Sequence, residues 1–245
     1  MLASTLFYMG MLGMALGALT LVLSIRCIRL DSRREALVVL VIGIALVTIA
    51  VFLPARVETS HSTELAQFIP DYQFNEFHQL EVNASCDRVY DAIKQVTPAE
   101  IKFYGLLTGI RRFGKSGRVS ILNPTSNEPI LNSATKSSFV VLSDNAHEMV
   151  LGTILRSPAG FRPRQYSDLG IKGLHLSGFI TGAISFTLQP DSADQCRLST
   201  ETRVFATDRV SALRFALYWR AIYPGSAIIR IFWLKAIKTR AEQAK

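Results

Sequence analysis

Charged side chains are absent from the beginning of the chain, where Leu2–Ile25 form one uncharged run. A second uncharged run, Ala36–Leu53, ends at Pro54. A helix rises about 1.5 Å per residue, so the first run exceeds the roughly 30 Å of bilayer hydrocarbon and the second is just long enough to span it. The sequence therefore predicts a two-helix transmembrane hairpin at residues 1–55.

Basic residues are also missing from the first eight positions, Met1–Tyr8. A cleaved signal peptide, the alternative for this segment, needs a basic region before its apolar stretch, so the sequence favours the hairpin. Gly10, Gly13 and Gly17 recur at three- and four-residue spacings along the first helix. We expect these small residues to let the second helix pack closely against the first.

Arginine is unevenly distributed around the predicted hairpin. Residues 26–35, between the two runs, carry four arginines and two acids, whereas residues 54–93 have only Arg56 and Arg88 as basic residues. Positively charged loops stay on the cytoplasmic side of a membrane. We therefore expect an integral protein of a bacterial inner membrane, with its soluble domain outside the cytoplasm.

Cysteine is scarce, with only Cys27, Cys86 and Cys196 in the chain. Three scattered cysteines are too few for a disulfide framework or a zinc cluster. A bond between Cys86 and Cys196 is chemically allowed in an oxidising compartment, but two unpaired thiols are the expected state.

Sequence motifs of metal sites and of nucleophilic catalysis are missing as well. The chain contains none of the patterns Gly-x-Ser-x-Gly, His-Glu-x-x-His and Cys-x-x-Cys. His78, His147 and His175 lie on different segments, without a carboxylate or second histidine at ligand spacing. We expect neither a metal ion nor a cofactor. Acid–base catalysis by His78 or Glu201 is the catalytic option that stays open.

One segment, Gly109–Ser116, matches the Walker A pattern, and Val140–Asp144 resembles the strand of a Walker B motif. A P-loop, however, follows a strand and opens a helix whose N-terminal amides hold the phosphates. Here a helix-like segment precedes the motif, and the loop interior is Arg-Arg-Phe, where close backbone approach favours glycine. Nucleotide binding through Gly109–Ser116 is therefore a minor alternative to a solvated basic loop.

A polar linker at residues 56–72 precedes residues 73–245, which have the length of one domain. Alternation of apolar and polar residues predicts five strands, and capping residues predict helices after the first strand and at the C-terminus. This order is typical of an α+β fold in which helices cover an antiparallel sheet. We expect strands at residues 73–83, 139–142, 148–155, 178–188 and 196–206, and helices at 85–96, 97–110, 128–135 and from Asp208 almost to the C-terminus, with a break or kink at Pro224.

Several segments of the domain are similar to those of bacterial SRPBCC proteins: Val89–Ile93, Thr200–Val204 with Asp208, and Tyr218–Ser226 with Ile229 and Arg230. Over about residues 77–242 the chain resembles the START-like or SRPBCC (helix-grip) superfamily, and within it an uncharacterised membrane-anchored bacterial subgroup. The superfamily includes polyketide cyclases, proteins of the birch-pollen-allergen type and steroidogenic lipid-transfer domains. The resemblance implies a curved antiparallel sheet wrapped on a long C-terminal helix, with a cavity between them.

Alternation along the predicted strand at residues 198–206 places Glu201 and Arg203 on one face. In one interpretation they line the cavity and fix the polar end of a ligand, together with Arg214 and Trp219 on the following helix. In the other they form an ion pair on the outer, solvated face, worth at most about 1 kcal/mol. The candidate ligand-binding residues are thus Glu201, Arg203, Arg214 and Trp219.

Basic charge is concentrated at the end of the chain. Residues 54–207 carry fifteen basic and fifteen acidic side chains, whereas residues 208–245 carry eight and two. With Trp233, Lys235 and Lys238, the last helix resembles a basic amphipathic surface that contacts an anionic membrane; a solvated basic face is the alternative. A membrane tether outside the cytoplasm disfavours nucleic acid as a partner.

Together these features predict a membrane-anchored domain that binds or transfers a lipid or another apolar small molecule. Its partners would be membrane lipids and that ligand. A small-molecule enzyme of the cyclase or dehydratase type is the alternative from another class, and a scaffold with a filled core is the third. Binding is favoured over catalysis because the chain has no recognisable catalytic constellation.

Overall fold

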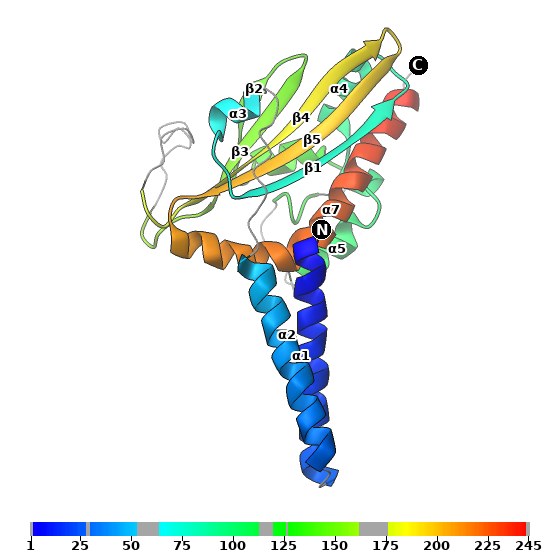
Figure 1. Ribbon diagram of the computed structural model, residues 1–245. Helices are drawn as coiled ribbons and strands as arrows, with labels where there is room; N and C mark the ends of the chain where they lie inside the picture. The colour runs from blue at the N-terminus through cyan, green and yellow to red at the C-terminus, as the bar shows by residue number, and fades with distance from the viewer. Residues whose placement is uncertain are drawn as a thin grey trace. The chain divides into compact units, whose positions relative to one another are not determined.

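A computed structural model describes residues 2–27, 30–52, 64–112, 120–125, 127–161 and 176–243 of the protein (Figure 1). The chain divides into two compact units. The first comprises residues 1–54 and 213–224, and the second comprises residues 55–212 and 225–245. The C-terminal helix therefore contributes to both units.

The first unit contains two helices packed side by side, α1 (Leu2–Cys27) and α2 (Leu30–Phe52) (Figure 1). A β-carbon on Gly10 would lie 2.7 Å from the carbonyl oxygen of Gly43, and one on Gly17 would lie 2.8 Å from the backbone nitrogen of Leu40. Side chains larger than hydrogen cannot fit at these distances, so the glycines permit the close approach of the helices. The close packing that the glycine spacing predicts is confirmed.

The predicted hairpin is confirmed as a helical pair, but membrane insertion is not. Within the part of the chain that the structure describes, no helix is long and apolar enough to cross a membrane. Insertion of the pair into a bilayer stays a prediction, as does the orientation that the arginine distribution indicates. Much of the predicted linker, residues 53–63, lies outside the described residues.

The first unit also includes part of α7 (Arg209–Gln243), the segment at residues 213–224. Phe215 and Trp219 are buried there and stack with ring centroids 5.8 Å apart. The hydroxyl of Tyr8 in α1 donates a hydrogen bond to the carbonyl oxygen of Ala221. These contacts explain why residues 213–224 of α7 are rich in apolar side chains: the segment packs within the first unit.

The second unit is built on a five-stranded antiparallel sheet with the strand order β1-β5-β4-β3-β2 (Figure 1). With the long C-terminal helix, this sheet confirms the α+β, helix-grip-like fold expected from the sequence. Each predicted strand is present, although β4 continues through the segment expected to form the turn. The strands are β1 (Phe74–Val82), β2 (Phe139–Asp144), β3 (Glu148–Arg156), β4 (Ile180–Ser192) and β5 (Gln195–Ala206).

The helices of the second unit differ from the prediction at one place. A single helix was expected at residues 97–110, but a 3-10 turn, η1 (Pro98–Glu100), is followed by a separate α5 (Tyr104–Arg111). Phe103 between them has a φ of 61°, the left-handed conformation, which no helix interior contains. The predicted capping box at Thr97 and Glu100 is present, but only a single 3-10 turn follows it. The other helices, α4 (Cys86–Gln95) and α6 (Ile130–Thr135), are close to expectation.

Helix α3 (Glu64–Phe68) lies inside the segment predicted to be a linker. Its first two free amides, those of Glu64 and Leu65, donate hydrogen bonds of 2.8 and 3.3 Å to the carboxylate of Glu148 on β3. Burial raises the pKa of this carboxyl group, and the two amide donors oppose that effect. A five-residue helix shows too little periodicity to be recognised, and its cap is more than 80 residues away in sequence.

The two faces of the sheet bury different clusters. On the inner face, side chains of β4 and β5 pack with α4 and the end of α7, in a core that includes Val89, Leu198, Trp233 and Ile237. On the outer face, α3 and the residues after it form a smaller cluster with Leu65, Ile69, Tyr72 and Ala183. The sheet is therefore covered on both sides.

Helix α7 begins at Asp208, as the sequence predicts. The carboxylate of Asp208 accepts hydrogen bonds from the amides of Ser211 (2.9 Å) and Gly178 (2.7 Å), and these bonds lower its pKa to about 2. The helix is not broken at Pro224, since it continues through this residue to Gln243, and a kink there stays a prediction. The boundary between the two units falls at this proline instead.

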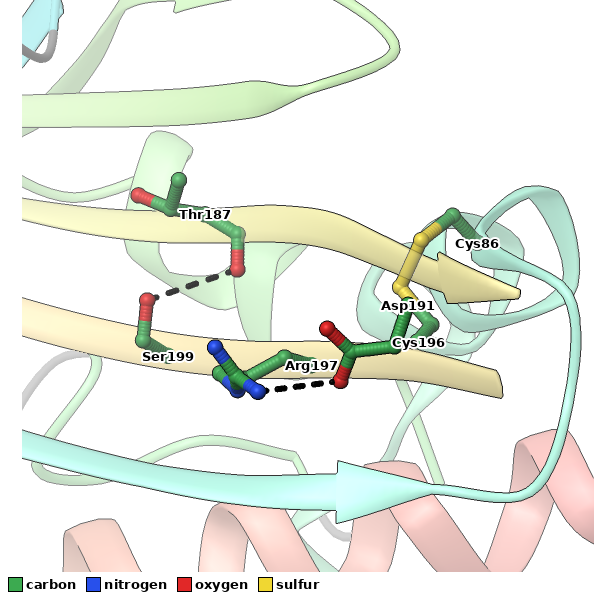
Figure 2. The surroundings of a disulfide bond; sticks show 6 residues. All are labelled: Cys86, Thr187, Asp191, Cys196, Arg197 and Ser199. Carbon is green, nitrogen blue, oxygen red and sulfur yellow. Dashed lines mark hydrogen bonds and ion pairs between the residues drawn. A yellow bond between two sulfur atoms is a disulfide. The ribbon is translucent and has the colours of Figure 1, made fainter.

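Cys86 and Cys196 form a disulfide bond, so the expectation of two unpaired thiols is wrong (Figure 2). The register explains the pairing: Val82, at the end of β1, lies opposite Cys196 on β5, and α4 begins with Cys86 after a short turn. The two Cα atoms are 5.1 Å apart although 110 residues separate them in sequence. Cysteine spacing alone contains no information about this strand pairing.

Removal of the disulfide should destabilise the second unit. The double variant Cys86→Ser/Cys196→Ser is expected to lose about 2–5 kcal/mol of unfolding free energy, because the bond closes a long loop of the unfolded chain. Urea unfolding of the full chain measures this loss, and Cys27→Ser, which leaves the bond intact, is the control. Titration should find one thiol in the denatured, unreduced chain and three after reduction. Three thiols before reduction would contradict the bond.

Candidate functional site

Glu201 and Arg203 form a buried ion pair on β5. Nε and Nη2 of Arg203 donate hydrogen bonds of 2.8 and 3.3 Å to the two carboxylate oxygens of Glu201. Only 7% of Glu201 and 2% of Arg203 are exposed to solvent. Their common face is the one that alternation predicts, but the pair is neither solvated nor turned toward α7.

The pair lies on the outer face of the sheet, beneath the segment that follows α3. Nη1 of Arg203 donates to the carbonyl oxygen of Ile69 (3.2 Å), and its guanidinium lies 4.7 Å from the ring centre of Tyr72. Nδ2 of Asn75 donates to Glu201 (2.5 Å). These contacts attach residues 69–75 to the sheet, which is a structural role. Their predicted ligand-binding role has no support from this position.

Arg214 and Trp219, the other two candidate ligand-binding residues, belong to the first unit. Arg214 is exposed, whereas Trp219 is buried against Phe215. The expected grouping of these two residues with Glu201 and Arg203 crosses the boundary between the units, so the structure does not describe it as one site.

Trp233 was expected at the membrane surface, and its position in the structure is different. It is only 2% exposed, and its ring packs 5.2 Å from that of Phe186 in the core, because it shares the sheet-facing side of α7. Lys235 is exposed, and the amine of Lys238 donates to the carbonyl oxygen of Glu81 (2.7 Å). Both lysines line a groove of about 1030 Å³ between β1 and the last turns of α7.

A second polar cluster lies on the inner face of the sheet, between β1 and α7. Glu76 is 2% exposed, and its carboxylate accepts a hydrogen bond from the hydroxyl of Ser226 on α7 (2.8 Å). The other carboxylate oxygen lies 3.1 Å from Nε2 of His78 on the same strand. Both oxygens of Glu76 are therefore already engaged by neighbouring side chains.

Arg230 lies one turn beyond Ser226 on α7 and is 9% exposed. Its guanidinium lies 5.2 Å from the ring centre of Trp233. Among the described residues, Nη1 of Arg230 and Nε1 of Trp233 are buried without a hydrogen-bond partner. A buried donor without a partner costs about 1–3 kcal/mol, and more when the group is charged.

Thr200 on β5 is the third residue with an unsatisfied polar atom in this region. Its Oγ1 is buried and lacks a partner within the described part of the chain. In the sheet, Thr200 lies opposite His78 on β1 and opposite Phe186 on β4. Phe186 also packs on Trp233, so Thr200 is the strand neighbour of a residue that contacts Trp233 on the inner face.

Charged groups of both signs act on Arg230 in the inner cluster. Burial lowers the pKa of Arg230, the charge of Glu76 opposes this effect, and the like charge of Arg111 on α5 adds to it. Burial also raises the pKa of Tyr104, which keeps its hydroxyl neutral as it donates to the carbonyl oxygen of Ile121. Around Arg230, the charge of Glu76 thus favours the charged guanidinium, and the charge of Arg111 opposes it.

The remaining sequence motifs do not form a site in the described residues. Gly109 lies inside α5, so the Walker-like segment opens within a helix, and its residues 113–119 lie outside the described part. His147 is exposed, and His175 also lies outside. No group of metal-binding side chains occurs among the residues that are described.

Comparison with known proteins assigns no function to the chain. No protein family and no curated protein matches the chain. Similar solved structures include a hypothetical protein from Helicobacter pylori (10% identity, TM-score 0.37, covering 75% of this chain and 96% of that one). Another is norcoclaurine synthase from Thalictrum flavum (14% identity, TM-score 0.27, covering 70% of this chain and 94% of that one). A third is the ZhuI aromatase/cyclase from Streptomyces sp. R1128 (11% identity, TM-score 0.25, covering 69% of this chain and 93% of that one). At these values the likeness assigns no ligand or reaction, so the site rests on its own residues.

The inner cluster was not predicted from the sequence, although two signals were available. Glu76 and His78 interrupt the apolar alternation of β1 on its inward side. Ser226, Arg230 and Trp233 recur at i, i+4 and i+7 along α7, so they share one helical face. A charge at such a sheet-facing position indicates a buried polar site.

Loss of Glu201 should show that the outer pair is structural. Glu201→Gln is expected to lower the unfolding free energy by about 3–5 kcal/mol, because Arg203 then stays buried without its counter-charge. The control is Arg197→Gln, which removes an exposed ion pair with Asp191 and should cost about 1 kcal/mol or less (Figure 2). Urea unfolding of the full chain compares the two. Equal, small losses would contradict the buried-pair interpretation.

Proposed function

We propose that the second unit binds a small, largely apolar molecule between the inner face of its sheet and α7. The single observation that supports this proposal most is the group of buried polar atoms of Arg230, Trp233 and Thr200, for which the described residues offer no partner. Ligand sites are typically apolar, with a few convergent polar groups that orient the ligand. The surrounding side chains, among them Phe186 and Ile184, are apolar and buried.

We further propose that the helical pair attaches this domain to a membrane and that the domain lies outside the cytoplasm. The uncharged runs of the sequence and the arginines at residues 26–35 support this proposal. The Cys86–Cys196 bond is a second support, because disulfides persist in oxidising compartments such as the periplasm. A tethered domain of this kind would bind or transfer lipids, or other apolar molecules, close to the bilayer.

The ligand proposal predicts that the full chain, purified in a nonionic detergent, retains an apolar small molecule. Native mass spectrometry should detect the complex, and extraction followed by mass spectrometry should identify the molecule. Thr200→Val removes one polar atom with little change in shape, and Trp233→Phe removes the indole nitrogen with a smaller aromatic ring in its place; the double variant should retain several-fold less ligand. Arg197→Gln, which removes only the exposed ion pair with Asp191, is the control. Reproducible absence of any ligand from the wild-type chain would overturn the proposal.

The membrane proposal predicts the behaviour of reporters fused to the C-terminus. Alkaline phosphatase, which is active only outside the cytoplasm, should be active in the fusion, and a cytoplasm-dependent fluorescent protein should be dark. Both chimeras should stay in the membrane fraction after alkaline carbonate extraction. The opposite reporter pattern would place the domain in the cytoplasm, and release by carbonate would argue against insertion.

A small-molecule enzyme of the cyclase or dehydratase type is the second candidate function. It is favoured by one observation, the pairing of His78 with the buried carboxylate of Glu76. A carboxylate that orients a histidine is a common acid–base arrangement. Conversion of a recovered ligand by the wild-type chain, with binding but no conversion by His78→Asn, would distinguish catalysis from simple binding.

A further inference from the structure

We propose that Arg230 recognises an anionic group, a carboxylate or a phosphate, on the molecule that the domain binds. This inference rests on the proposed binding function and specifies the chemical class of its ligand. It is derived from the donors around Arg230, from the charges nearby, and from the elements that hold them in place.

The first argument is the position of Arg230. Its side chain is nine-tenths buried, and the described residues supply no acceptor for Nη1. A guanidinium has only donors and keeps its charge inside a protein. An uncompensated buried charge is strongly destabilising, so this donor is expected to have an acceptor in the functional state of the protein.

The negative charge of Glu76 acts on Arg230, but the carboxylate of Glu76 accepts no described hydrogen bond from the guanidinium. Its two oxygens are engaged by Ser226 and His78, and no ion pair between Glu76 and Arg230 occurs among the described residues. Arg111 adds a second positive charge that acts on Arg230. A neutral ligand would supply no charge to balance that of Arg230.

The second argument is that other unsatisfied donors accompany Arg230. Nε1 of Trp233 can only donate, and the hydroxyl of Thr200 can donate as well. The guanidinium lies over the ring of Trp233, and Phe186 connects that ring to the level of Thr200 in the sheet. A carboxylate offers two oxygens and a phosphate three or four, which suits a set of donors from α7 and β5. The single oxygen of a hydroxyl or ketone group would accept hydrogen bonds from one or two donors at most. It would not neutralise the charge of Arg230.

The alternative place for an anion is the groove along β1 and the end of α7. Two of its basic side chains already have partners: Arg240 donates to both carboxylate oxygens of Glu100 at 3.0 Å, and Lys238 is engaged by Glu81 and Glu242, while Lys235 is exposed to solvent. These groups are also partly exposed, so water and salt screen them. The structure therefore favours Arg230 over the groove.

The test compares three soluble probes with the same six-carbon chain: hexanoate, hexyl phosphate and hexanol. Isothermal titration of the full chain in a nonionic detergent at neutral pH measures each affinity. The wild-type chain is expected to bind at least one of the two anions about tenfold or more tightly than hexanol, as is typical of hydrogen bonds to a charged group. Inorganic phosphate, without an alkyl chain, tests whether a free anion is sufficient.

Arg230→Gln should remove the preference for the anion and leave hexanol binding unchanged. Arg240→Gln, which changes a partly exposed arginine on the same helix, is the matched control and should retain the preference. If Arg230→Gln fails to fold, the preference of the wild-type chain for an anion over hexanol still tests the proposal. Trp233→Phe keeps a smaller aromatic ring but removes the donor, and a loss of several-fold in anion affinity is expected.

The possible outcomes separate the two proposals. Hexanol and the anions binding equally well would overturn the role of Arg230 and leave small-molecule binding intact. Absence of binding by every probe would count against the proposed function itself. A preference for hexyl phosphate over hexanoate would indicate a lipid phosphate, and the reverse order would indicate a carboxylic acid. Tight binding of inorganic phosphate alone would indicate a free anion as ligand.

Discussion

The register between β1 and β5 is the constraint on which the rest of the second unit depends. It places Val82 opposite Cys196 and thereby brings Cys86 within bonding distance of β5. The same register sets His78 beside Thr200 on the inner face. A shift by one residue would exchange the two faces of β1, since successive side chains point to opposite sides. The disulfide lies at the end of this ladder and so fixes the register where the strands would otherwise fray.

The two buried charged clusters illustrate two ways in which a sheet can hold an arginine. On the outer face, each described contact of Arg203 has an acceptor: a carboxylate, a backbone carbonyl and an aromatic ring. Such a satisfied cluster holds chain segments together. On the inner face, Arg230 is equally buried but its Nη1 lacks an acceptor among the described residues. Both arginines are thus buried, and they differ in their hydrogen bonds. The described donors of Arg203 have acceptors, which indicates a structural role, whereas Nη1 of Arg230 has none among the described residues, which makes it the candidate for function.

Much of the fold could be predicted from the sequence, because the strands alternate and the helices have recognisable caps. The buried side of Glu201 and Arg203 could not, because alternation shows that two residues share a face but not which layer covers that face. The covering layer is the segment after α3, with Ile69 and Tyr72, and α3 itself is too short to show periodicity. Trp233 was assigned to the surface because its neighbours are basic, although its spacing from Ser226 and Arg230 places it toward the sheet. The disulfide depends on a strand pairing between distant segments, which local patterns do not contain.

Helix α7 begins and ends in the second unit, yet its middle, residues 213–224, belongs to the first. The first unit therefore needs both the earliest and some of the latest residues of the chain. During synthesis α1 and α2 emerge long before their third partner, so their packing can be completed only after residues 213–224 have been made. A chain that stopped before residue 213 would lack parts of both units at once.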